Sequence, residues 1–246
     1  MDMIDHGKRR LLRQFCCGGA TLGATLAAGF GVANAATGKK TSLSPEEALK
    51  VLKEGNEKYL TDSPLRAVQG RERRLEIARG QAPLAVLVSC SDSRVPPELL
   101  FGRGLGELFI VRNAGNTVDT VALGSIEYAV AELGVPLIVV MGHERCGAVD
   151  AALSVVQDNT VFPGSIGQMI EPIIPAVLRA QAQIDAKKPV DRAALLDAAV
   201  RQNVRRVVER MRTSEAMLTE PLAQGKLKIV GARYDLDDGR VEFFES

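Results

Sequence analysis

The chain contains little histidine and no excess of charge of either sign. Of its 246 residues only two are histidine and four are cysteine, none is tryptophan, and the formal net charge is +1. The balanced charge removes the bulk electrostatic argument for nucleic-acid binding, because a protein that neutralises phosphates needs a basic surface. Basic residues also alternate with acids along the helical segments, which is typical of a solvated surface. We therefore expect no nucleic-acid partner.

The length and apolar content indicate one large globular domain after the N-terminal segment. Hydrophobic residues make up 46% and charged residues 25% of the sequence, which is ordinary for a soluble protein. No internal repeat and no low-complexity tract follows the N-terminal segment. We predict a single domain with a substantial core over residues 36–246.

Residues 1–35 predict a cleavable export signal. The basic stretch 8–13 precedes an uncharged run, and Ala33-Asn34-Ala35 offers a small-x-small cleavage site. The paired Arg9 and Arg10 and the low hydrophobicity resemble a twin-arginine signal, which predicts a periplasmic protein. The alternative is a membrane anchor, which the glycine and threonine content of the run weakens. No stronger apolar segment follows, so we expect no membrane association after cleavage.

Cleavage of this signal would leave two cysteines and one histidine, namely Cys90, Cys146 and His143. In an oxidising compartment two cysteines invite a disulfide, and this is the main alternative to a metal site. A disulfide, however, would leave His143 and the neighbouring Asp92 and Arg94 without a role.

Near-continuous apolar runs predict strands that are covered on both faces. Such runs occupy 83–90, 108–111 and 137–141, and a weaker one occupies 227–230. A short antiparallel edge strand is expected at 241–244, after a turn rich in aspartate and glycine.

The segments between these runs have helical spacing. Helices are expected from Pro45, over 71–79 and over 118–133. The segment 166–212 is helical but broken at three prolines, Pro172, Pro175 and Pro189. The alternation predicts an α/β fold with a mostly parallel central sheet of four strands, the antiparallel edge strand, and helices on both faces.

Cys90, His143 and Cys146 form a ligand set suited to one Zn²⁺ per chain. Cys90 and His143 each follow a predicted parallel strand at its carboxyl end, the edge where sites form in open α/β sheets. Cys146 is expected in the first turn of the next helix, where backbone N–H groups favour a thiolate. A structural zinc site would need a fourth cysteine or histidine. The fourth ligand is therefore water or the carboxylate of Asp92.

Asp92 and Arg94 are predicted to control that fourth position. Two thiolates and a neutral imidazole leave the zinc complex formally neutral, so its water is less acidified than at a three-histidine site. Ionised Asp92 would orient this water, and a bidentate pair with Arg94 would keep the carboxylate ionised and away from the metal. Asp92 on Arg94 opens the site, and Asp92 on zinc closes it.

The spacing Cys-x-Asp-x-Arg after one strand and His-x-x-Cys after another resembles the β-class carbonic anhydrases. The similarity extends from about residue 81 to residue 153, including the runs 111–115 and 124–130, and the order of elements extends it over nearly the whole mature chain. The resemblance implies reversible hydration of CO₂ to bicarbonate by a zinc-bound hydroxide, with Asp92 and Arg94 as the catalytic dyad. It also implies a homodimer or homotetramer with active sites at the subunit interface.

Four further residues are implied as substrate contacts by the same resemblance. Gln81, nine residues before the first cysteine, occupies the place of a donor to substrate. Phe109 and Tyr128 match apolar pocket positions, and Gly147 matches the small residue after the second cysteine. Ala114 stands where many members carry a larger valine, so the pocket is expected to be roomier.

The absence of tryptophan bears on regulation. Members with a non-catalytic bicarbonate site that favours the closed form carry a tryptophan three residues before the first cysteine, where this chain has Leu87. Together with Gln81, this predicts the open form at neutral pH. Two other functions stay open: hydrolysis of COS or CS₂ by the same zinc chemistry, and a non-catalytic zinc or carboxysome-like interaction protein. The intact pair of Asp92 and Arg94 argues against the second.

Overall fold

The computed structural model describes residues 40–62, 68–183, 191–213 and 216–244. These residues belong to one compact unit, Ala33–Ser246. The predicted export signal and Pro189 lie outside the described residues. Within the described part of the chain, no helix has the length and apolar character needed to cross a membrane.

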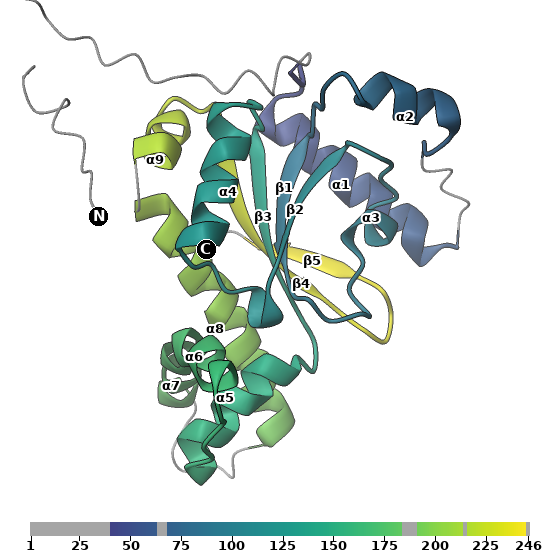
Figure 1. Cartoon of the computed structure of the whole chain (residues 1–246). Coiled ribbons are helices and arrows are strands. Elements are labelled where there is room, and N and C mark those ends of the chain that lie inside the picture. The colour runs from purple at the N-terminus through teal and green to yellow at the C-terminus, as the bar shows by residue number, and fades with distance from the viewer. Residues whose placement is uncertain (1–39, 63–67, 184–190, 214–215, 245–246) are drawn as a thin grey trace, which may run out of the picture. The chain divides into compact units, whose positions relative to one another are not determined.

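A five-stranded sheet with the order β2-β1-β3-β4-β5 forms the centre of this unit (Figure 1). The pairs β2–β1, β1–β3 and β3–β4 are parallel, and β5 runs antiparallel to β4. The strands are β1 (Ala85–Ser89), β2 (Leu108–Arg112), β3 (Leu137–His143), β4 (Lys228–Tyr234) and β5 (Val241–Phe244). This confirms the predicted sheet of four parallel strands with an antiparallel edge strand.

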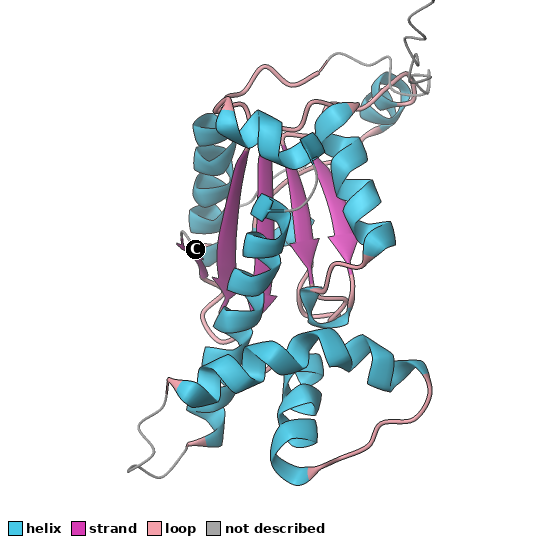
Figure 2. Cartoon of the chain, turned by 90° about the vertical axis from the view of Figure 1, so that its left-hand side faces the viewer, coloured by secondary structure: helices cyan, strands magenta, loops and turns pink. Residues whose placement is uncertain are grey.

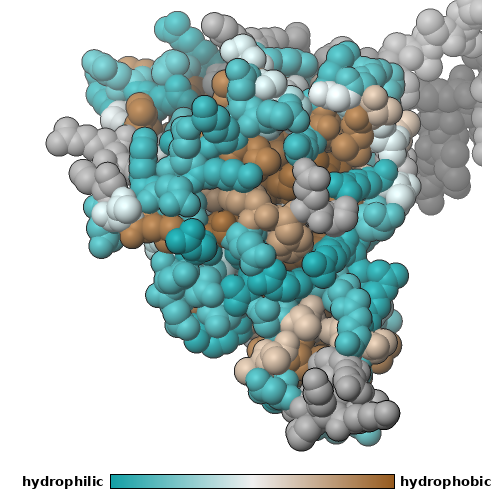
Figure 3. All heavy atoms as spheres, turned by 180° about the vertical axis from the view of Figure 1, so that it is seen from behind, coloured by the Kyte–Doolittle hydropathy of each residue, from teal (hydrophilic) through white to brown (hydrophobic). Residues whose placement is uncertain are grey.

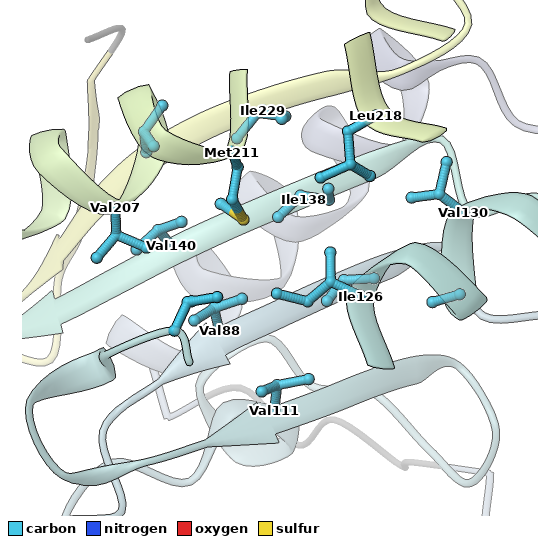
Figure 4. Packing of buried hydrophobic residues seen from close by; sticks show 14 of the residues in the cluster. Val88, Val111, Ile126, Val130, Ile138, Val140, Val207, Met211, Leu218 and Ile229 are labelled. Carbon is cyan, nitrogen blue, oxygen red and sulfur yellow. The ribbon is translucent and has the colours of Figure 1, made fainter. Parts of the chain in front are cut away.

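Helices cover both faces of the sheet, which explains why β1 and β3 are buried along their whole length. Alternate residues of a strand point to opposite faces, so both sets of side chains must be apolar. One face packs against α4 (Thr120–Ala131), α8 (Arg192–Thr213) and α9 (Ala216–Ala223). Figure 4 shows Met211 of α8 and Ile126 of α4 lying over Val88 and its neighbours on this face. The opposite face packs against α1 (Pro45–Leu60) and α3 (Pro97–Leu100).

A third group of helices lies beyond the carboxyl ends of the parallel strands (Figure 2). Its elements are α5 (Gly147–Asp158), α6 (Ser165–Ile170), the 3₁₀ turn η3 (Glu171–Ile173) and α7 (Ile174–Ala182). They pack with the first half of α8 into a cluster that also contains Cys90 and Cys146. The two cysteines are therefore held between the sheet edge and an apolar helical layer.

The predicted helices are present with shifted ends. The capping box of Ser44 and Glu47 begins α1 as expected, whereas α2 (Arg71–Ile77) ends two residues earlier than predicted. The segment 166–212 divides at Pro172 and Pro175, each of which lies in the first turn of a new helix, where a missing N–H costs nothing. The short α3, and α9 with its internal Pro221, were not predicted.

Close packing of α8 on β3 depends on Gly142, the residue before His143. A Cβ atom at Gly142 would lie 2.8 Å from Val204 Cγ2 and 2.9 Å from Val200 Cγ1. We expect Gly142→Ala to lower the free energy of unfolding by about 1–3 kcal/mol, since overpacking a closed core forces side chains off their rotamers. Urea unfolding measures this difference.

Gly124 of α4 supplies the matched control. A Cβ there meets no atom of the described residues within 4 Å, so Gly124→Ala should leave stability unchanged or raise it by up to about 1 kcal/mol. Equal effects of the two substitutions would contradict the packing argument.

Candidate metal centre

The ends of the adjacent strands β1 and β3 bring together three soft or imidazole ligands. Cys90 follows β1 directly, His143 is the last residue of β3, and Cys146 caps α5 three residues later. Their ligand atoms all lie within 4.8 Å of one another, and all three residues are buried. Cys146 is thus the N-cap of α5, just before the first turn in which it was expected.

The two sulfur atoms are spaced for a shared cation. Cys90 Sγ and Cys146 Sγ lie 4.0 Å apart, and both thiols are free. Two thiolates on one tetrahedral zinc would be about 3.8 Å apart with Zn–S bonds of about 2.3 Å, whereas a disulfide needs about 2.05 Å. The spacing therefore matches zinc ligation better than a disulfide.

Charge favours the same conclusion. The hydrogen bond from the Cys146 thiol, aided by backbone N–H groups, lowers the pKa of Cys90 to about 4. The facing Cys90 sulfur, together with burial, raises the pKa of Cys146 far above its ordinary value. Two adjacent buried thiolates repel one another, so a bound cation is needed to hold both in the ionised form.

The imidazole of His143 is oriented with a free lone pair toward the sulfurs. Its Nδ1 lies 2.8 Å from the backbone oxygen of Glu144. A carbonyl only accepts, so Nδ1 carries the proton and Nε2 presents its lone pair. The buried Nε2 has no hydrogen-bond partner in the described residues. An unsatisfied buried nitrogen beside two sulfurs is the feature expected of a metal ligand, so these three residues fit zinc.

Asp92 and Arg94 form a bidentate ion pair at the mouth of this cluster. Arg94 Nε donates to Asp92 Oδ1 at 2.9 Å, and Arg94 Nη2 donates to Asp92 Oδ2 at 2.8 Å. These bonds hold the pKa of the Asp92 carboxyl well below its usual range. Asp92 Oδ2 also lies 3.9 Å from His143 Nε2. The carboxylate is therefore ionised, turned toward Arg94, and still within reach of a group held by the three ligands.

The loop that carries Cys90 and Asp92 is fixed by Arg112, a residue given no role from the sequence. Arg112 Nε donates to the Cys90 carbonyl at 2.8 Å, and its Nη2 donates to the Asp92 carbonyl at 2.6 Å. The N–H of Gly115 donates to Cys90 Sγ at 3.3 Å. Arg112 and Gly115 both lie in the run 111–115, whose resemblance to a family motif was the only signal for them.

The residue before Cys146, Arg145, has a left-handed backbone conformation. Arg145 has φ +50°, a conformation that a long side chain adopts only where its surroundings hold it. Its guanidinium bonds both carboxylate oxygens of Asp237 in the β4–β5 turn, at 3.0 and 2.6 Å. This contact anchors the backbone between His143 and Cys146.

The residues implied as substrate contacts do not all lie near the metal centre. Gly147 begins α5 next to Cys146, and Ala114 and Ser91 line a hollow of about 550 Å³ beside the centre. Gln81 lies just before β1, at the amino ends of the strands and therefore opposite the cysteines, in a hollow lined by residues of 40–42 and of α2. Phe109 of β2 pairs with Val86 of β1 near the amino ends of these strands. Tyr128 of α4 packs on the face of the sheet that α4 and α8 cover. One chain therefore does not bring Gln81, Phe109 or Tyr128 to the cysteines.

Comparison with known proteins agrees with this geometry. The carbonic anhydrase family model matches residues 85–241. Carbonic anhydrase 2 of Mycobacterium tuberculosis is 42% identical over 197 residues, which cover 80% of this chain and 91% of that protein. A solved structure of tetrameric β-carbonic anhydrases from Sordaria macrospora superposes with a TM-score of 0.64 and 28% identity, over 70% of this chain and 86% of that one. The chain belongs to the β-class carbonic anhydrases.

Other members of the family support the assignment. Carbonic anhydrase of Pseudomonas aeruginosa is 41% identical over 172 residues, 68% of this chain and 75% of that protein. The Coccomyxa β-carbonic anhydrase, solved in complex with acetazolamide, has a TM-score of 0.61 and 28% identity, over 82% of this chain and 86% of that one. The protein is thus a carbonic anhydrase, a lyase, and its family and fold support CO₂ hydration.

Proposed function

We propose that the protein catalyses the reversible hydration of CO₂ to bicarbonate and a proton with one zinc ion held by Cys90, His143 and Cys146. The observation that carries the proposal is the buried His143 Nε2, which has no hydrogen-bond partner in the described residues and faces two thiols whose sulfurs are 4.0 Å apart. Zinc bound there would supply the hydroxide nucleophile near neutral pH.

Asp92 is proposed to orient the nucleophile, with Arg94 setting its direction. Because Arg94 engages both carboxylate oxygens, Asp92 stays ionised and can accept only through its remaining lone pairs. We propose that this arrangement is the open form expected from the sequence. Neither ring nitrogen of His143 is free to shuttle protons, because Nδ1 bonds the Glu144 carbonyl and Nε2 would bind the metal. The other histidine, His6, lies in the predicted signal. The proton therefore leaves through water, buffer or carboxylates.

Gly147 is proposed to leave room for substrate. A Cβ atom at Gly147 would meet no described atom within 4 Å, so the space in front of the Cys146 backbone is open. A larger side chain would occupy this space without displacing a described atom.

Stopped-flow hydration of CO₂ with a pH indicator tests the proposed reaction. We expect rapid hydration that is lost after chelation and restored by added zinc. The same assay with COS or CS₂ addresses the alternative that the zinc chemistry acts on these substrates. Activity on COS with none on CO₂ would replace the proposal.

We also propose a homodimer or homotetramer in which a second copy completes the site. β2 is an edge strand with a neighbour on one side only among the described strands, and such an edge is open to pairing. On the side away from β2, Figure 3 shows apolar side chains gathered at the middle of the face and surrounded by polar ones, so this second surface would suit the further contact of a tetramer. A partner's Gln81 would then reach a site that the same chain's Gln81 cannot, since the five residues of β1 span about 16 Å.

Mixing two inactive variants tests this arrangement. If Gln81 serves the partner's site, Gln81→Ala and Asp92→Asn chains unfolded together and refolded at equal amounts should regain about a quarter of native activity, because half the dimers are mixed and each carries one intact site. Each variant refolded alone is the control. If Gln81 served its own site, no mixed dimer would contain an intact site and activity would stay absent.

Residues 1–35 are proposed to direct twin-arginine export to the periplasm. This route would carry the folded protein, so zinc would occupy both thiolates before they meet an oxidant. We expect Arg9→Lys with Arg10→Lys to retain the protein in the cytoplasm, whereas Lys8→Arg should be exported normally. Cell fractionation measures the distribution, and a periplasmic double variant would contradict the proposed route.

A further inference from the structure

The backbone N–H of Gly115 forms a hydrogen bond with one of the proposed zinc ligands, Cys90. The N–H donates to Cys90 Sγ at 3.3 Å, in a buried setting. Gly115 has φ +71° and ψ +22°, a left-handed conformation that glycine adopts readily but also leaves readily. A Cβ atom at this position would lie 2.6 Å from Ile173 Cδ1. The direction of this N–H therefore depends on contacts that hold the backbone conformation of Gly115.

Asn203 of α8 provides that constraint from 88 positions further along the chain. Asn203 Nδ2 donates to the carbonyl of Gly115 at 2.7 Å, and the bond is buried. The N–H of Gly115 belongs to the preceding peptide plane and its carbonyl to the following one. Bonds to Cys90 and Asn203 therefore fix both planes that flank the glycine, and with them its φ and ψ.

The surroundings of Asn203 make a polar side chain costly unless it has such a role. Asn203 is 2% exposed and lies between the buried Gln202 and Val204 on a helix whose other buried side chains are mostly aliphatic. A buried amide without partners is unfavourable because it loses its hydrogen bonds to water, and an aliphatic residue would pack there without that loss. The same stretch of α8 packs Val200 and Val204 against the residue before His143. One helix thus supports the backbones beside two of the three ligands.

We propose that Asn203 is a positioning residue for the Cys90 thiolate, acting through the Gly115 peptide. The inference rests on the proposed zinc site and extends it to a residue that touches neither the metal nor substrate. Groups that orient metal ligands through hydrogen bonds typically change metal affinity by about 10–100-fold when removed.

Asn203→Leu, which keeps the branched four-atom shape of the side chain and removes the donor, tests the proposal. The first measurement is the rate of zinc release from the loaded full-length mature protein to a chromogenic chelator. We expect release about tenfold faster than from the native protein. The second is the thiolate-to-cobalt charge-transfer band of the Co²⁺-substituted protein, which should shift in Asn203→Leu. Asn203→Ala provides a smaller replacement, should leucine prevent folding.

Gln202→Leu is the matched control on the same helix. Gln202 is 7% exposed, and its Nε2 donates to Gln183 Oε1 at 2.9 Å, without contact with the centre. It should lose comparable stability yet release zinc at the native rate with an unshifted cobalt band. The inference would be overturned if both Asn203 variants released zinc at the native rate, or if Gln202→Leu released it as fast as Asn203→Leu. Either result would leave the proposed zinc site unaffected. A native protein that binds no zinc would overturn the proposed function and this inference with it.

Discussion

Cys146→Ser is expected to lose zinc and stability together. A serine hydroxyl does not ionise near neutral pH and therefore does not replace a thiolate ligand. Removing groups that merely orient ligands already weakens metal binding by about 10–100-fold, so removing one of three ligands should weaken it by more than about 100-fold. At a fixed zinc concentration, a 100-fold loss of binding lowers the free energy of unfolding by about 2.7 kcal/mol. Zinc analysis and thermal unfolding, both made at one zinc concentration, measure the two effects.

Val149→Ala separates loss of the ligand from loss of packing. Val149 lies three residues further along α5 and is fully buried, and deleting its methyl groups should cost about 2 kcal/mol. We expect this variant to keep about one zinc per chain despite its lower stability. A Cys146→Ser protein with full zinc content would show that the ligand assignment is wrong.

Asp92→Asn should keep zinc and lose turnover. The amide has nearly the volume of the carboxylate but no charge, so it neither pairs with Arg94 nor accepts strongly from water. Orienting and proton-accepting groups typically contribute about 100-fold to 10,000-fold to rate, and we expect kcat for CO₂ hydration to fall by about 100-fold or more. Because Asp92 faces Arg94 and is not needed to hold the metal, the zinc content should stay at about one per chain.

Asp150→Asn is the matched control for that variant. Asp150 of α5 also pairs with an arginine, its Oδ1 lying 2.8 Å from Arg192 Nη2, but both side chains are about half-exposed and neither belongs to the proposed metal centre. Solvent-exposed pairs of this kind contribute about 0–1 kcal/mol to stability, so both kcat and zinc content should be unchanged. Equal losses in the two variants, or full activity of Asp92→Asn, would remove Asp92 from the proposed mechanism.

Local sequence patterns were sufficient to predict the parts of the molecule that depend on burial. The continuous apolar runs at 83–90 and 137–141 predicted β1 and β3, because only strands covered on both faces need apolar residues at every position. The carboxyl ends of these parallel strands place Cys90 and His143 at one end of the sheet. The fold prediction was confirmed on this basis, and the two short helices α3 and α9 escaped it because neither is long enough to show a clear period.

The supporting contacts could not be predicted in the same way. Asn203 bonds a residue 88 positions away, and Arg112 bonds carbonyls that carry no sequence signal of their own. Both look like ordinary polar residues within periodic segments, and their roles depend on tertiary geometry alone. Gln81 shows the opposite difficulty. Its spacing from Cys90 indicated a role in the site, yet β1 separates the two within a chain, and only an assembly of chains would bring them together.

Metal analysis combined with stopped-flow CO₂ hydration on the purified mature protein tests the central claim most directly. The account predicts about one zinc per chain, rapid hydration of CO₂, loss of that activity in step with zinc during chelation, and its return when zinc is restored. Full CO₂ hydration by protein that holds no zinc would contradict the claim, and so would a fully zinc-loaded protein with no activity on CO₂.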